Sequence, residues 1–280
     1  MGLAESPLLL MVAPNGARRT KADHPALPLT PAELAREAAA CREAGATLLH
    51  LHVRDGQGRH SLDPEPCRAA IAAVRREVGD GMVVQVTTEA VGVYAPEQQM
   101  ATVRALRPEA VSLALRELIP DPAEPGPAAD FLRWLRRERI APHFILYTPE
   151  EVAAFQDLRR RGVIPQARPF ALFVLGRYVD PVEVRPRDLL PFLAVHSGGD
   201  DTAPWSVCAF GPAEAACALA AAALGGHVRV GFENNLHLSD GRLAPSNAAL
   251  ADQIRRGAAL LGRPLATIDR TRAFLAETAA

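Results

Sequence analysis

Short apolar runs rich in aliphatic and β-branched residues alternate along the chain with longer stretches of helical character. This alternation is typical of parallel strands joined by helical crossovers. The runs expected to form strands are residues 8–12, 47–53, 82–87, 110–113, 143–147, 170–175, 205–209 and 228–230. The pattern therefore predicts eight strand–helix repeats.

Several of the intervening helices have recognisable starts. Residues 30–33, Thr-Pro-Ala-Glu, offer a capping hydroxyl, a proline for the first turn and a carboxylate at the positive helix end. The same device is expected at 148–151 and at 211–214. The last helix of the eighth repeat is expected at 246–261, and a terminal extra helix at 270–277. Each strand is thus followed by a helix that can return the chain to the next strand.

Eight such repeats in 280 residues predict an α/β fold, a (β/α)8 TIM barrel, as a single domain over residues 1–280 with an extra C-terminal helix. A doubly wound sheet with a dinucleotide site is disfavoured, because no Gly-x-Gly-x-x-Gly sequence follows a predicted strand. In TIM barrels the catalytic groups collect at the C-terminal ends of the strands. Candidate chemistry is therefore expected at that end.

Two histidines near the end of the second predicted strand share one face. His50 and His52 are two residues apart, so both side chains are expected to point into the barrel at its mouth. Two neutral imidazoles in an apolar lumen each need a partner, and one metal ion satisfies both. The alternative is a histidine pair bonded to neighbouring backbone or carboxylate groups.

The eighth predicted strand offers a third ligand. Its period of two places Arg229, Gly231 and Glu233 on one face, with Glu233 nearest the mouth. The second and eighth strands both flank the first, so side chains of one layer can meet across the lumen. Two histidines and one carboxylate form a known catalytic zinc set. The alternative is that Arg229 and Glu233 pair with each other in the barrel.

Four stretches that lie far apart in the chain resemble motifs of the β-keto acid cleavage enzymes. They are VAPNGAR at 12–18, HLHVRD at 50–55, VRVGFENN at 228–235 and SN at 246–247. The resemblance runs from the first strand to the last helix and keeps the order of the motifs. It implies a TIM barrel, usually a homotetramer, with Zn2+ held by His50, His52 and Glu233.

The resemblance also implies a reaction. A β-keto acid would condense with acetyl-CoA and give acetoacetate and a new acyl-CoA by a retro-Claisen route. A β-keto acid can chelate Zn2+ through its ketone and carboxylate oxygens, so that the metal stabilises the enolate. Arg229 matches the family's catalytic arginine and would stabilise developing oxyanion charge. A buried ion pair is the alternative role of Arg229.

Two positions depart from the common family pattern. Asn234 stands where the family often has an aspartate that takes part in proton transfer, and an amide cannot take up a proton at neutral pH. Glu89 lies in the stretch 85–90, which differs from the glycine-rich sequence common in the family. We expect Glu89 to replace the missing carboxylate, either as base or as partner for a cationic substrate group. Capping of the third helix is its alternative role.

Other polar residues are expected around the mouth. Asn15, Thr87 and Ser112 are candidates for substrate contacts, although a turn residue and strand-end hydroxyls also have local explanations. Arg54 and Asp55 are expected to orient the histidine ligands, since a metal-bound histidine usually donates its other ring proton.

Three further residues are expected to lie away from the metal. His143 begins the fifth predicted strand and so is placed at the stability face, and His227 precedes the eighth strand. Lys21 is the single lysine of the chain and lies in the loop after the first strand, where a solvated amine lacks the desolvation that a Schiff-base nucleophile needs. A contact with a CoA phosphate is the role expected for Lys21, if it has one.

The composition excludes several classes of partner. With 31 basic and 32 acidic residues the net charge is -1, which disfavours nucleic acid or an anionic membrane as partner. The four cysteines show no Cys-x-x-Cys spacing, which disfavours a zinc ribbon or a redox dithiol. The chain start lacks the basic residues of a signal peptide, and a cytoplasmic location is expected.

Two other functions compete with β-keto acid cleavage. A zinc-dependent hydrolase on the same fold would use metal-bound hydroxide, but such barrels usually place the histidine pair on the first strand. A catalytically inactive metal-binding homologue would fit if the departures at Asn234 and Glu89 mark lost activity. Acetyl-CoA dependence separates these functions, because only the cleavage reaction requires the thioester.

Overall fold

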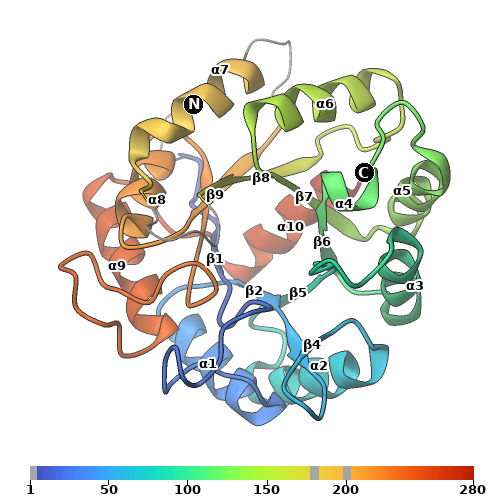
Figure 1. The fold of residues 1–280 in the computed structure, drawn as a ribbon. Coiled ribbons are helices and arrows are strands. Elements are labelled where there is room, and N and C mark those ends of the chain that lie inside the picture. Colours follow the sequence, from blue (N-terminus) through green and yellow to red (C-terminus); the bar gives the residue numbers. More distant parts are fainter. Residues whose placement is uncertain (1–4, 177–182, 198–202) are drawn as a thin grey trace.

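The chain winds around a closed barrel of eight parallel strands (Figure 1). The computed structural model describes residues 5–176, 183–197 and 203–280. The barrel strands are β1 (Leu10–Val12), β2 (Leu48–Leu51), β5 (Val83–Thr87), β6 (Ala110–Ala114), β7 (Ala141–Leu146), β8 (Phe170–Leu175), β9 (Trp205–Ala209) and β10 (His227–Val230). Each strand pairs with its neighbour in sequence and β10 pairs with β1, which closes the ring. The predicted (β/α)8 TIM barrel is therefore confirmed.

Helices cover the outside of the barrel, as Figure 1 shows. They are α1 (Pro31–Glu43), α2 (Pro64–Val78), α3 (Pro96–Leu106), α4 (Leu115–Leu118), α5 (Gly126–Glu138), α6 (Pro149–Arg160), α7 (Leu190–His196), α8 (Glu214–Ala223), α9 (Asn247–Leu260) and α10 (Ile268–Ala279). A 3-10 turn at Pro186–Leu189 precedes α7, and β3 (Val53–Arg54) pairs with β4 (His60–Ser61) as a short hairpin after β2. The hairpin therefore lies at the C-terminal end of the barrel, next to the predicted site.

Local sequence explains where most of the helices begin. The Thr30 hydroxyl accepts a hydrogen bond from the backbone N–H of Glu33, and Thr148 does the same at the start of α6, as predicted. The prediction at 211–214 is wrong, because α8 begins only at Glu214 and has Ala213 as its N-cap. An alanine offers no capping oxygen.

Helix α10 closes the N-terminal end of the barrel. Its residues Leu275 and Ala279 pack against the lowest layer of the lumen, which is apolar. That layer is formed by Leu9, Met11, Leu48, Val83, Ala110, Ala141 and Phe170. In Figure 1, α10 lies behind the centre of the ring of strands. The polar residues of the lumen lie above this layer, toward the C-terminal ends of the strands.

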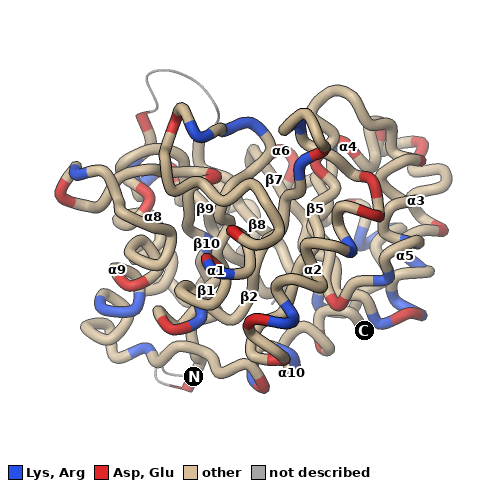
Figure 2. Tube along the Cα trace, turned by 90° about the horizontal axis from the view of Figure 1, so that it is seen from below, with Lys and Arg blue, Asp and Glu red and all other residues tan. Residues whose placement is uncertain are grey.

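Charged residues of both signs are interspersed over the surface (Figure 2), in keeping with the net charge of -1. Among the described residues, no helix is long and apolar enough to cross a membrane.

A buried arginine ties the N-terminal segment to the end of α8. Arg263 is 1% exposed, and its guanidinium donates to the carbonyl oxygens of Ser6 and Ala222 at 2.8 Å. It also donates to the carbonyl oxygens of Gly226 at 2.6 Å and Gly225 at 3.4 Å. One side chain thus donates to four backbone carbonyl groups and joins the N-terminal segment to the connection between α8 and β10.

Replacing Arg263 with methionine is expected to lower the free energy of unfolding by about 3 kcal/mol, because methionine fills the space but leaves buried carbonyl groups without donors. Urea denaturation followed by circular dichroism measures the change. Arg160→Met is the matched control, since Arg160 is exposed and its ion pair in the described structure is with Asp157 on its own helix. We expect less than about 0.5 kcal/mol there. Equal losses in the two variants would contradict the role of Arg263.

Candidate active site

Three buried side chains meet at the C-terminal end of the barrel. The Nε2 atoms of His50 and His52 are 3.0 Å apart, and the Glu233 Oε2 atom lies 3.5 Å from the first and 3.2 Å from the second. Within the described part of the chain, these three form the one group of histidine, cysteine or acidic residues that could hold a metal ion. A tetrahedral ion with bonds of 2.0–2.1 Å spaces its ligand atoms about 3.3 Å apart. The observed separations therefore fit zinc.

The hydrogen bonding of the group also fits a metal. Glu233 Oε2 is buried and makes no hydrogen bond with any described residue. Burial lowers the pKa of His50 to about 3, so its imidazole is neutral, as a ligand must be. Burial alone would raise the pKa of Glu233, but the Arg229 guanidinium beside it outweighs burial and holds that pKa well below its usual value. Two imidazoles and one carboxylate form a donor set that zinc binds.

Glu233 reaches this group by a turn, which differs from its expected place on the eighth strand. Strand β10 ends at Val230, and the chain turns at Gly231, whose φ is +136°. A Cβ atom at Gly231 would lie 2.4 Å from the carbonyl oxygen of Ala13. The backbone N–H of Glu233 then donates to the same oxygen at 3.0 Å. Close backbone contact with the end of β1 therefore positions the carboxylate.

A second glycine packs directly against the carboxylate side chain. A Cβ atom at Gly16 would lie 2.6 Å from the Cγ of Glu233, and the φ of Gly16 is +61°. Arg54 donates to the carbonyl oxygens of Gly16, Ala17 and Arg19, which holds this loop in place. Arg54 thus supports the loop that carries Gly16, and its expected part in orienting the histidine ligands stays a prediction.

Arg229 lies in the lumen beside the carboxylate. Its Nη2 atom is 2.8 Å from Glu233 Oε1, 3.3 Å from Asn234 Oδ1 and 3.4 Å from the Cys208 sulfur. The predicted alternatives for Glu233 therefore coexist: one oxygen pairs with Arg229 and the other faces the histidines. Asn234 accepts from the guanidinium through its amide oxygen, while its Nδ2 has no partner among the described residues.

Glu89 lies beside the three ligand side chains. Its Oε2 atom is 3.9 Å from His52 Nδ1, and its Oε1 atom is 4.0 Å from Arg18 Nε. Burial raises the pKa of the Glu89 carboxyl. Helix α3 begins at Pro96, seven residues later, with Ala95 as its N-cap, so Glu89 does not cap it. The carboxylate lines the same small cavity as His50 and Glu233.

The three candidates for substrate contacts lie around the same centre. Thr87 and Ser112 line that cavity together with His50 and Glu233. Ser112 Oγ is buried with no hydrogen-bond partner among the described residues. Asn15 donates from Nδ2 to the carbonyl oxygen of His52 at 3.2 Å, and its Oδ1 is likewise without a described partner. Among the residues that line the cavity, Ser112 Oγ and Glu233 Oε2 are thus the polar atoms that lack a described partner.

Other sequence expectations are not met by the contacts. Asp55 accepts from Arg59 and from the backbone of its own turn, so it does not orient a histidine. Lys21 pairs with Glu33 at 2.8 Å at the start of α1, and its expected contact with a CoA phosphate stays a prediction. His143 is the third residue of β7, which begins two residues before its predicted start. It is fully buried inside the barrel and does not lie at the stability face.

Two residues of the site were missed by sequence reasoning. The Oε1 atom of Gln85 lies 2.9 Å from the Nδ1 atom of His50 and can accept a hydrogen bond from it, and Tyr147 lines the small cavity. Gln85 stands two residues before Thr87 on one strand, so strand alternation already placed both on the inner face. Tyr147 follows β7 directly, and strand ends are where site residues collect.

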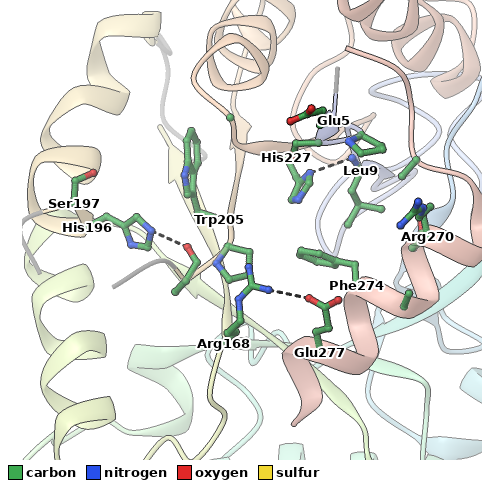
Figure 3. A pocket seen from close by; sticks show the side chains of 18 residues that line it. Glu5, Leu9, Arg168, His196, Ser197, Trp205, His227, Arg270, Phe274 and Glu277 are labelled. Atoms are coloured by element: carbon green, nitrogen blue, oxygen red, sulfur yellow. Dashed lines mark hydrogen bonds and ion pairs between the residues drawn. The ribbon is translucent and has the colours of Figure 1, made fainter. Parts of the chain in front are cut away.

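A further pocket lies at the opposite end of the barrel (Figure 3). It has a volume of about 520 Å³ and is lined by Trp205, His227, Phe274 and an ion pair of Arg168 with Glu277. These residues come from strand starts and from α10, and the three candidate metal ligands are absent from its lining. This pocket is therefore separate from the group that could bind a metal.

The fold and the site define a TIM barrel with a group at its C-terminal mouth that could bind a metal. A family model described as beta-keto acid cleavage enzyme matches residues 7–276. The chain belongs to the β-keto acid cleavage enzyme family, and it is an enzyme of that class.

Relatives of known name are similar over nearly the full length. A 3-keto-5-aminohexanoate cleavage enzyme from Fusobacterium nucleatum is 32% identical over 275 residues, which cover 96% of this chain and 97% of that protein. A 3-oxoadipate:acetyl-CoA acetyltransferase from Cupriavidus necator is 32% identical over 279 residues, which cover 96% and 94%. The solved ternary complex of ObcA with a C4-CoA adduct and oxalate has a TM-score of 0.70 at 19% identity, covering 90% of this chain and 67% of that one, and shows the shared fold alone.

Proposed function

We propose that this protein is a zinc-dependent β-keto acid cleavage enzyme that converts a β-keto acid and acetyl-CoA into acetoacetate and a new acyl-CoA. The observation that carries the proposal is the buried group of His50, His52 and Glu233, with Arg229 beside it, in a chain of this family. The relatives named for cleavage and for acetyl-CoA acetyl transfer support the same reaction class. A homotetramer and a cytoplasmic location stay predictions.

Each residue would have a distinct part. Zinc bound at the three side chains would supply Lewis acidity toward the ketone and carboxylate oxygens of the substrate. Arg229 would hold negative charge that develops on these oxygens, through guanidinium N–H groups fixed by Glu233 and Asn234. Asn15, Thr87 and Ser112 would orient the substrate through the polar atoms that face it.

Glu89 would accept the proton from the carbon between the two carbonyl groups. Asn234 cannot do so, and its amide oxygen already accepts from Arg229 at 3.3 Å. Glu89 is a carboxylate with access to the cavity that zinc and substrate would share. A carboxyl with a raised pKa is better matched to proton transfer near neutral pH than an ordinary glutamate.

The reaction itself is tested with a panel of β-keto acids that carry cationic, neutral and acidic side chains. Each is incubated with zinc-loaded protein, with and without acetyl-CoA, and acetoacetate is measured. We expect acetoacetate from at least one substrate, only when the thioester is present. Substrate hydrolysis without acetyl-CoA would favour the hydrolase, and no acetoacetate from a zinc-loaded protein across the whole panel would overturn the assignment.

Replacing Glu89 with glutamine is expected to lower kcat about 10²–10³-fold, because the amide keeps the shape but cannot take a proton. Zinc content should not change. Glu117→Gln is the matched control: Glu117 is also a partly buried carboxyl with a raised pKa, but it accepts from Ala90 and Gln99 and does not line the cavity. We expect that variant to keep kcat within about threefold. Full turnover of all substrates by Glu89→Gln would show that Glu89 is not the base.

A further inference from the structure

A chain of hydrogen bonds runs from His50 down through the lumen of the barrel. His50 Nδ1 lies 2.9 Å from Gln85 Oε1, and Gln85 Nε2 lies 3.3 Å from His143 Nδ1. His143 Nε2 is 2.8 Å from Ser206 Oγ, and that hydroxyl donates to the carbonyl oxygen of Ala171 at 3.1 Å. All four side chains are buried, with exposures of 0–1%. Of the residues joined by these hydrogen bonds, His50 alone belongs to the group that could bind a metal.

The backbone end sets the direction of every bond. The carbonyl of Ala171 can only accept, so the single hydroxyl proton of Ser206 points to it. Ser206 must then accept from His143, whose proton therefore sits on Nε2 and whose Nδ1 is a bare acceptor. This is the opposite of the arrangement in which the hydroxyl would donate to the ring.

The remaining two bonds follow from this tautomer. Because His143 Nδ1 must accept, Gln85 turns its NH2 group to it and its carbonyl oxygen to His50. That oxygen accepts only from an N–H, so the proton of His50 sits on Nδ1. The Nε2 of His50 is then left with its lone pair directed at His52 and Glu233.

We propose that Gln85, His143 and Ser206 are positioning residues, which hold His50 in its metal-binding tautomer before any metal arrives. The proposal rests on the proposed function in that His50 is taken to be a ligand. In an isolated histidine both neutral tautomers are populated, and one of them cannot bind at Nε2. The row of hydrogen bonds favours one tautomer, because the backbone carbonyl of Ala171 on β8 fixes the direction of each bond up to His50.

Packing holds the middle of the chain in place. The His143 ring stacks on Phe170 with centroids 4.0 Å apart and planes inclined by 4°. Burial also lowers the pKa of His143 well below its usual value, so the ring stays neutral and has one proton to place. A neutral ring of fixed orientation transmits one direction of bonding only.

The tautomers are measured directly by NMR of metal-free protein labelled with ¹⁵N-histidine. Long-range ¹H–¹⁵N correlations distinguish an Nδ1–H ring from an Nε2–H ring. We expect His50 to be protonated at Nδ1 and His143 at Nε2 in the absence of zinc. A mixture at His50, or protonation at its Nε2, in a parent protein that binds zinc tightly would overturn the proposal.

Two substitutions of Gln85 separate positioning from packing. Gln85→Leu removes the acceptor for His50 and is expected to weaken zinc binding about 10–100-fold in competition with a chromophoric chelator. Gln85→Glu keeps that acceptor but has no donor for His143. We expect zinc affinity to be restored to within about threefold of the parent, and His143 to change to the Nδ1–H tautomer. Equal zinc affinity in the leucine variant and the parent would contradict the role of Gln85.

Ser206→Ala tests the far end of the chain. Without the hydroxyl, nothing fixes the proton of His143, and we expect both tautomers of His50 to appear in the spectrum. Thr102→Val is the matched control, because it removes a buried hydroxyl that donates to a backbone carbonyl at 2.7 Å outside this chain. Its His50 signals should match the parent, and a Ser206→Ala spectrum that also matched would refute the proposal. Parent protein with the expected tautomers but no zinc affinity would instead overturn the proposed function.

Discussion

Glu233→Gln is expected to abolish acetoacetate formation, with a loss of about 10³-fold or more in kcat/KM. The amide is a poor zinc ligand, and it also leaves the buried Arg229 cation without the carboxylate that lies 2.8 Å from it. Both changes make it less favourable to place a zinc cation beside the Arg229 cation, so zinc affinity should fall together with activity. Zinc content after dialysis and acetoacetate production measure the two effects separately.

The control for that substitution is Glu37→Gln. Glu37 accepts from the backbone N–H of Asn247 at 2.8 Å, and a glutamine oxygen can accept the same bond. Parent protein stripped with a chelator should regain activity when zinc is added, and the Glu37 variant should do the same. If Glu233→Gln also recovered with zinc, Glu233 would not be a ligand on which the reaction depends.

Arg229→Lys is expected to lower kcat about 10²–10³-fold while zinc stays bound. A lysine keeps the positive charge next to Glu233, but its ammonium is a point charge that cannot reproduce the fixed fork of guanidinium donors. The loss should therefore appear in turnover and not in metal content. Steady-state kinetics with saturating acetyl-CoA measure kcat, and zinc analysis of the same sample measures the metal content.

The companion variant is Arg229→Met, which removes the charge and leaves the Glu233 carboxylate without its buried partner. Because an uncompensated charge at a buried site is costly, this variant should lose stability and alter zinc binding as well. A lysine variant with kcat within threefold of the parent would show that the guanidinium has no part in the chemistry.

The barrel could be predicted because each strand and helix leaves its own pattern in a short stretch of sequence. Alternating apolar runs and capped helices report on one repeat at a time, and the strands at Phe170–Leu175 and Trp205–Ala209 have the predicted bounds. His50 and His52 could be found for the same reason, since their spacing alone places them on one face.

Contacts that depend on register and turns could not be predicted from single residues. Glu233 lies beyond the end of β10, in a turn whose path depends on a contact with the backbone of Ala13, near the other end of the sequence. The position of His143 was misjudged because β7 starts two residues earlier than the apolar run suggests, which moves the ring from the rim of the barrel into its interior. Its bond to Gln85 joins β7 to β5 across the lumen.

Helix α10 closes the barrel at its N-terminal end. Leu275 and Ala279 pack under the lowest layer of the lumen, whose side chains fill the barrel there. In the proposed reaction, two reactants and two products would therefore share the C-terminal mouth at which His50, His52 and Glu233 meet. The molecule bound deeper in this mouth could leave only after the one bound above it, which would impose an order on binding and release.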